Sequence, residues 1–146
     1  MRALLLFAFA LTLASCTVID PPPSWVTLDD RPGRDFAAVS AQGSRLTVRR
    51  HKNPTGGTLA FWVAAIKEEL VDGRGYSLLE SIDVRTDSGR AGTELLLGTD
   101  RELKPHLYLL AVFVDAKKVT LVEAGGEEAT LRPELPALRA SVRSLR

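Results

Sequence analysis

Few side chains in this sequence could do covalent or acid–base chemistry, and they lie far apart. The chain has one cysteine, Cys16, and two histidines, His51 and His106. A catalytic site needs a nucleophile, a base and a group that orients the base. His51 stands in the basic run of residues 49–52, where neighbouring cations make an imidazole a poorer base. His106 precedes a long apolar run and is expected at a strand end. The sequence therefore predicts no catalytic residues.

The N-terminus has the composition of an export signal. Met1 and Arg2 precede an apolar block, residues 3–14, which is shorter than the roughly 20 residues of a membrane-spanning helix. The block ends in Leu13-Ala14-Ser15-Cys16, which resembles the lipoprotein box of bacterial lipoproteins. In that family cleavage leaves the cysteine first and lipidated. The alternatives are an ordinary secreted protein with an incidental cysteine and an uncleaved N-terminal anchor.

The resemblance to bacterial lipoproteins implies a diacylglycerol and an N-acyl chain such as palmitate on Cys16. Because acyl chains contribute roughly 0.8 kcal/mol per buried CH₂, two of them anchor a protein stably in a membrane. Lipidation would consume the only cysteine, so none remains for a disulfide, a nucleophile or a zinc site. We therefore expect no metal and no cofactor. Thr17, where aspartate often signals retention in the inner membrane, favours the outer membrane.

The expected organisation is a signal peptide, a tether and one domain. Residues 1–15 form the signal peptide, residues 16–24 carry the lipid and a proline-rich tether, and residues 25–146 form a single globular domain. Three consecutive prolines, residues 21–23, favour the polyproline II conformation in the tether.

Charge argues against a nucleic-acid partner. The chain has 19 Lys and Arg residues against 18 Asp and Glu residues, and loss of Arg2 with the signal brings them to balance. No global basic field would recruit nucleic acid. The basic run of residues 49–52 could bind phosphate or lipid headgroups, although such a run is more often a solvated strand end.

An apolar run, residues 107–114, organises the expected fold. It lacks the alternation of a half-buried strand and is rich in β-branched and aromatic residues, which predicts a strand buried on both faces. Both faces of the sheet must then be covered, so we expect a helix on each.

Two amphipathic segments predict these helices. Residues 59–71 form the first, with Thr58 as N-cap and Gly73 in the left-handed conformation at its end. Its apolar face comprises Leu59, Trp62, Val63, Ile66 and Leu70. The second is expected to begin near Glu134, so that Pro136 falls in the first turn. Its apolar face comprises Leu131, Leu135, Leu138, Val142 and Leu145. We expect Arg139, Arg143 and Arg146 to be solvated, and the alternative is a basic helix that faces the membrane.

The order of elements resembles the Mog1p/PsbP-like proteins. The other expected strands are residues 25–28 (alternatively an apolar lid), 36–40, 45–49, 76–84, 93–98 and 119–123, the last ended by Gly125-Gly126. The resemblance covers roughly residues 25–146 and rests on Gly56-Gly57-Thr58-Leu59, Gly75-Tyr76, Gly89 and Ala124-Gly125-Gly126. It implies an α+β fold, an α/β/α sandwich on a mostly antiparallel sheet with helices on both faces. That group includes photosystem accessory proteins, a small-GTPase partner and lipoproteins, so the fold does not fix the function.

These observations predict a lipid-anchored protein of the cell envelope that binds or assembles without catalysis. Its expected partners are the membrane, through Cys16, and an envelope protein. Phe61 and Trp25 are candidate partner contacts, because neither has a place on the expected apolar faces; alternatively, both complete the edge of the core. The other functional alternatives are an envelope hydrolase, using His51 or His106 with a carboxylate, and a lipoprotein that binds a small ligand.

Overall fold

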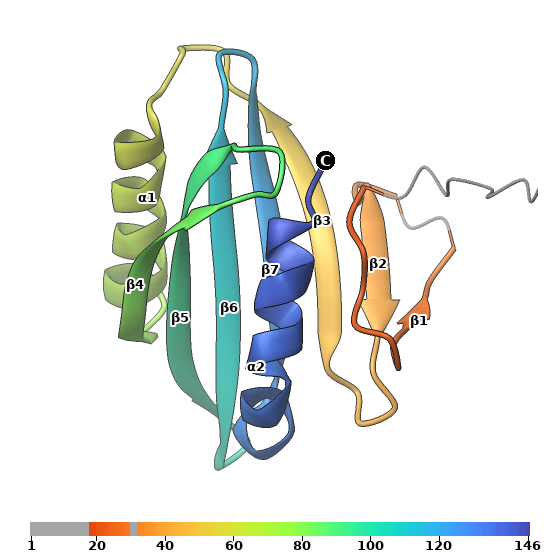
Figure 1. Cartoon of the computed structure of the whole chain (residues 1–146). Coiled ribbons are helices and arrows are strands. Elements are labelled where there is room, and N and C mark those ends of the chain that lie inside the picture. The colour runs from red at the N-terminus through yellow and green to blue at the C-terminus, as the bar shows by residue number, and fades with distance from the viewer. Residues whose placement is uncertain (1–17, 30–31) are drawn as a thin grey trace, which may run out of the picture.

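The computed structural model describes residues 18–29 and 32–146 and contains one sheet with two long helices (Figure 1). The strands are β1 (Val26–Thr27), β2 (Phe36–Val39), β3 (Arg45–Lys52), β4 (Ser77–Arg85), β5 (Ala91–Arg101), β6 (Lys104–Val114) and β7 (Lys118–Glu127). The helices are α1 (Leu59–Lys67), the π-helical turn η1 (Glu68–Gly73) and α2 (Glu128–Arg143).

The seven strands form one antiparallel sheet in the order β1-β2-β3-β7-β6-β5-β4. The predicted hairpins are present, and the apolar run forms β6, between β7 and β5. In the β6–β7 register, His106 lies opposite Glu127 and Val114 lies opposite Val119. The antiparallel sheet expected from the sequence is therefore confirmed.

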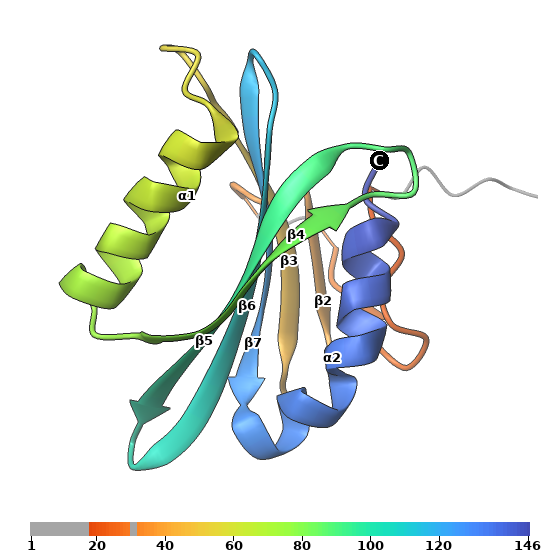
Figure 2. The ribbon, with the colours of Figure 1, turned by 60° about the vertical axis from the view of Figure 1, so that its left-hand side comes forward.

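Strand β6 is buried on both faces, as its composition predicts. Leu107, Leu109, Ala111 and Phe113 belong to one apolar cluster, together with the buried face of α2. Leu110 and Val112 belong to a second cluster, with Val63 of α1 and Leu70 of η1. Since successive side chains of a strand point to opposite faces, α1 and α2 pack against opposite sides of the sheet (Figure 2).

Helix α1 begins as predicted but ends differently. The Thr58 hydroxyl caps it, accepting a 3.2 Å hydrogen bond from the main-chain nitrogen of Phe61. The expected left-handed Gly73 is wrong, because the helix widens into η1 and the chain turns later. Gly75 takes the left-handed conformation instead, with φ +72°, and its nitrogen donates to the carbonyl of Val71 at 3.1 Å.

Helix α2 begins at Glu128, earlier than predicted, and contains both Pro133 and Pro136. A proline inside a helix removes a main-chain hydrogen bond and costs roughly 3 kcal/mol. Both prolines lie on the exposed side, whereas the predicted apolar face is buried throughout: Leu131, Leu135, Leu138, Val142 and Leu145. Leu131 precedes both prolines and is completely buried. Because its burial requires helix before Pro133, it favours the early start of α2.

Of the three arginines expected to be solvated, Arg143 is exposed as predicted, whereas Arg139 and Arg146 have partners in the fold. Arg139 bonds both Glu94 and Glu80 of the neighbouring strands. Arg146 pairs with Asp20 at 3.0 Å, which joins the chain after α2 to the N-terminal segment. The ion pairs of Arg139 and Arg146 thus connect α2 and the residues after it to the sheet and to the N-terminal segment.

Candidate functional site

The residues singled out by the sequence fall in three different places. Cys16 lies outside the described residues. Trp25 is 7% exposed and packs in the apolar cluster under α2, so its indole is part of the core and presents almost no surface to a partner. Phe61 is 56% exposed on α1 and stacks edge-on against Trp62, with ring centroids 5.5 Å apart. Trp25 and Phe61 therefore do not form one surface.

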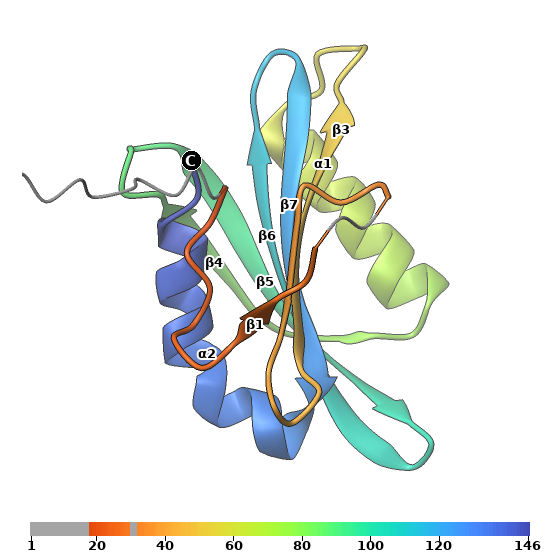
Figure 3. The same ribbon diagram turned by 90° about the vertical axis from the view of Figure 1, so that its right-hand side faces the viewer.

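The segment expected to be a free tether is packed against the domain from Val18 onward. The carbonyl of Val18 accepts a 3.0 Å hydrogen bond from the nitrogen of Arg146, and the nitrogen of Asp20 donates to Ser144 Oγ at 2.8 Å. Ile19 is completely buried, and Pro22 closes a turn with Trp25. Residues 18–24 are thus held to the C-terminus rather than extended as a spacer (Figure 3).

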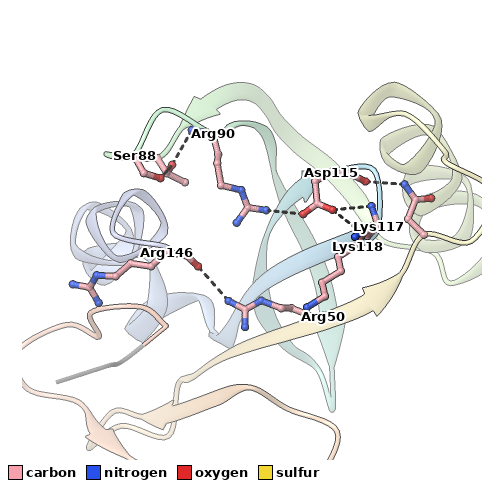
Figure 4. A network of polar contacts seen from close by, with 9 residues as sticks. Arg50, Ser88, Arg90, Asp115, Lys117, Lys118 and Arg146 are labelled. Carbon is pink, nitrogen blue, oxygen red and sulfur yellow. Dashed lines mark hydrogen bonds and ion pairs between the residues drawn. The ribbon is translucent and has the colours of Figure 1, made fainter.

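Cations gather at this same end of the sheet (Figure 4). Arg50 Nη2 donates to the carbonyl of Arg146 at 3.2 Å. The turn between β6 and β7 carries Lys117 and Lys118, whose main-chain nitrogens both donate to Asp115 Oδ1 at 2.8 Å. These two bonds, helped by Arg90, lower the pKa of Asp115.

A polar network lies on the face of the sheet that carries α1. Arg49 donates to Glu123 through Nε at 2.6 Å and Nη2 at 2.5 Å, and the Tyr108 hydroxyl donates to Glu123 Oε1 at 2.5 Å. Glu123 is only 8% exposed, so these bonds compensate a carboxylate taken out of water. The hydrogen bonds that Arg49 donates to Glu123 raise the pKa of Arg49, and burial followed by the Glu123 charge raises the pKa of Tyr108 well above its usual range.

Below this network the sheet is hollowed. The hollow has a volume of about 320 Å³ and is lined by Gly43, Arg45, Tyr76, Thr99, Arg101, His106, Leu107, Tyr108, Gly125 and Gly126. Arg45 lies opposite Gly125 in the register, and Gly125 lies opposite Tyr108. Since Gly125 has no side chain, the row from β3 across β7 to β6 has a gap between the arginine and the phenol ring.

The hollow is cationic and hydroxylic. Arg101 Nη2 donates to the Tyr76 hydroxyl at 3.2 Å, and the Tyr76 and Tyr108 ring centroids are 5.9 Å apart. Among the described residues no carboxylate lies within 4 Å of Arg45 or Arg101 to form an ion pair, and none lines the hollow. Such a site can bind an anion with its arginines and an apolar group with its rings.

Sequence reasoning missed this hollow. Gly125-Gly126 was expected to end a strand, and this is wrong: β7 continues through both glycines to Glu127. The sequence did contain one signal for the hollow, the alternation of side chains along β5 and β6. Alternation places Thr99 and Arg101 of β5 on the same face of the sheet as His106 and Tyr108 of β6.

The histidines do not form the pair that a hydrolase would use. His106 Nδ1 lies 3.0 Å from the carbonyl oxygen of Lys104, and His51 is exposed near the end of β3. In residues 18–29 and 32–146, neither imidazole has a carboxylate within 4 Å, and no group of three His, Cys, Asp or Glu residues could hold a metal ion. A search of the same residues for a helix long and apolar enough to cross a membrane found none.

Comparisons with known proteins identify the fold. No family model and no curated protein matches the sequence. Solved structures do match it. LpqN from Mycobacterium tuberculosis, which is involved in cell envelope biogenesis, has a TM-score of 0.69 and 12% identity, covering 84% of this chain and 78% of LpqN. The cyanobacterial PsbP of Synechocystis has a TM-score of 0.58 and 16% identity, covering 86% and 82%.

A third similar structure is the Pseudomonas aeruginosa protein PA94, of unknown function. Its TM-score is 0.62 at 16% identity, with 84% of this chain and 80% of PA94 covered. At these identities the likeness concerns the fold alone. It supports the PsbP-like fold expected from the sequence and leaves the function to the chain's own residues.

Proposed function

We propose that this chain is a lipid-anchored protein of the cell envelope that binds a partner or ligand and does not catalyse a reaction. Its domain would be the α/β/α sandwich of the Mog1p/PsbP-like proteins. The observation that carries the proposal is the spacing between Cys16 and Val18. If Cys16 is lipidated, only Thr17 separates it from a residue hydrogen-bonded to the C-terminus.

This spacing would hold one end of the domain against the bilayer. Two residues of extended chain span at most about 7 Å. The end in question carries Arg50, Lys117 and Lys118, and anionic lipids attract such residues by about 1 kcal/mol each. The end of the domain that the anchor would hold at the bilayer is therefore also the end that carries these basic residues.

The hollow would then face away from the membrane. It lies toward the turn between β5 and β6, at the other end of the sheet from the C-terminus (Figure 1). Along β6, Tyr108 in the hollow is six residues from Val114 at the other end of the strand, which corresponds to about 20 Å. A site at this distance suits a ligand or partner from the aqueous side.

Envelope location also has support from similarity. LpqN, which shares the fold, is involved in cell envelope biogenesis. A hydrolase is the less favoured function, since neither His51 nor His106 is paired with a described carboxylate. The hollow favours the ligand-binding form of the proposal.

Mass spectrometry of the mature protein tests the anchor. The full chain is expressed in a diderm bacterium, and we expect a mature chain that begins at diacylated, N-acylated Cys16 and fractionates with the outer membrane. Cys16→Ser should abolish both lipidation and membrane association. Thr17→Asp is the matched control, since it should keep the lipid and move the protein to the inner membrane. Unmodified Cys16, or a mature chain that retains Leu13-Ala14-Ser15, would contradict the proposal.

Crosslinking in intact cells tests the binding role. We expect a reproducible envelope partner or ligand for the anchored protein, and less of it for Cys16→Ser. Recovery of none under several growth conditions would count heavily against a binding module.

A further inference from the structure

The donors in the hollow come from several sides. Arg45 reaches it from β3, Arg101 and Thr99 from β5, His106 from β6, and Tyr76 from the segment before β4. The Arg45 guanidinium forms no hydrogen bond or ion pair with the described residues, so all of it is available to a ligand. Arg101 is held in place by the Tyr76 hydroxyl, and it retains further N–H groups.

Two carboxylates near the hollow, Glu123 and Glu127, already have hydrogen-bond partners. Glu123 is bonded by Arg49 and Tyr108. Glu127, opposite His106 in the register, accepts a 3.1 Å bond from Lys104. Within the described residues, the guanidinium groups of Arg45 and Arg101 form no ion pair with a carboxylate.

The number and spread of these donors indicate the anion. A carboxylate has two oxygens in one plane, which a single arginine satisfies. A phosphate monoester has three terminal oxygens and a charge of about −1.5 to −2, and so suits two guanidinium groups with additional hydroxyl donors. The Tyr108 hydroxyl donates to Glu123, so its ring, with that of Tyr76, forms an apolar wall.

We infer that the hollow binds the phosphoryl group of a small soluble phosphate ester, with Arg45 and Arg101 as its principal ligands. The volume of about 320 Å³ is at the small end of ligand pockets, which favours a compact molecule. A soluble source is favoured over a lipid headgroup because the hollow lies at the opposite end of the sheet from Val18. This inference names the ligand of the hollow and so rests on the binding function proposed above.

Gly125 offers a way to block the hollow without disturbing the fold. An added Cβ would lie 3.7 Å from the carbonyl oxygen of Leu107 and 3.7 Å from Tyr108 Cδ2, both ordinary contacts. A side chain at position 125 would point to the same face of the sheet as Glu123, into the gap beside Arg45. Valine is well suited to a strand, so Gly125→Val should fill the hollow and keep the sheet.

Calorimetric titration of the full chain in detergent micelles tests the inference, with glycerol 3-phosphate and inorganic phosphate as probes at constant ionic strength. We expect saturable binding that Arg45→Gln weakens about tenfold or more, as loss of a charged hydrogen bond does. Gly125→Val should weaken the same binding by filling the hollow. Arg74→Gln is the control, since Arg74 pairs with Glu69 on the surface outside the hollow and should bind like the wild type. Thermal unfolding of each variant confirms that it is folded.

Several results would overturn the inference. These are the absence of saturable binding, an equal loss in Arg74→Gln, no loss in folded Arg45→Gln, or acetate binding as tightly as phosphate. Binding to phosphatidic-acid vesicles but not to glycerol 3-phosphate would overturn the soluble source. Phosphate binding by unlipidated Cys16→Ser would leave this inference standing even where the anchor fails, whereas an anchored protein that binds no phosphate would overturn this inference alone.

Discussion

Arg139 Nε on helix α2 donates a 2.7 Å hydrogen bond to Oε1 of Glu94, a strand carboxylate that is 1% exposed. The other oxygen of Glu94 has no hydrogen-bond partner, so Arg139 is the described residue that compensates this buried charge. The same guanidinium bonds Glu80 on the edge strand at 2.5 Å. A single side chain thus joins α2 to both β5 and β4.

Removing Arg139 should therefore destabilise the fold strongly. Breaking a buried pair from one side costs about 3–5 kcal/mol, and partial exposure of Arg139 places Arg139→Ala near the lower limit. Urea unfolding monitored by circular dichroism measures this. Arg132→Ala is the matched control, because Arg132 pairs with Glu128 on the exposed side of the same helix and should change stability by about 0.5 kcal/mol or less. Equal effects of the two variants would contradict the assignment.

The N-terminal segment should contribute to stability like any other part of the core. Ile19 is completely buried, so Ile19→Ala is expected to lower the free energy of unfolding by about 2–5 kcal/mol. Val26→Ala, at a position that is 65% exposed, should change it by about 0.5 kcal/mol or less. A negligible effect of Ile19→Ala in urea unfolding would mean that this segment is a free tether after all.

Periodicity predicted the elements that bury continuous apolar faces. The unbroken apolar run of β6 and the leucine spacing of α2 are both patterns of residues close together in the sequence. The apolar side chains of both elements are buried as expected. Their ends were less predictable, because they depend on tertiary packing. Pro133 and Pro136 argue locally against an early start of α2, yet burial of Leu131 outweighs them.

The β5–β6 turn shows why local signals can be missing. Glu102 and Leu103 take left-handed conformations, with φ of 51° and 65°, although turns of this kind usually contain glycine or asparagine. The long register of β5 with β6 imposes the turn. The meeting of the two arginines in the hollow was hard to predict for a related reason. Arg45 lies on β3 and Arg101 lies on β5, and two other strands, β7 and β6, separate them in the sheet.

Phe61 stays a candidate partner contact. Because its ring is 56% exposed, Phe61→Ala should change the free energy of unfolding by only about 0.5 kcal/mol while weakening capture of an envelope partner. Leu70→Ala, in η1 directly after this helix and in the apolar cluster that α1 also joins, should instead cost about 2–5 kcal/mol. Stability is measured by urea unfolding and capture by crosslinking in cells. A loss of stability like that of Leu70→Ala would retire the contact and make Phe61 part of the scaffold.

The Tyr108–Glu123 bond predicts a dependence of stability on alkaline pH. Burial and the Glu123 charge raise the pKa of Tyr108 above the ordinary 10.0, so folding favours the neutral phenol. The stabilisation from this group is complete below the unfolded pKa of about 10 and is lost as the pH rises above it. We expect one of the two tyrosines to resist ionisation until the protein unfolds, measured by the near-ultraviolet absorbance of phenolate. Tyr108→Phe should remove the resistant tyrosine and flatten the alkaline loss of stability. Two tyrosines that titrate together in the folded wild type would contradict the burial of this bond.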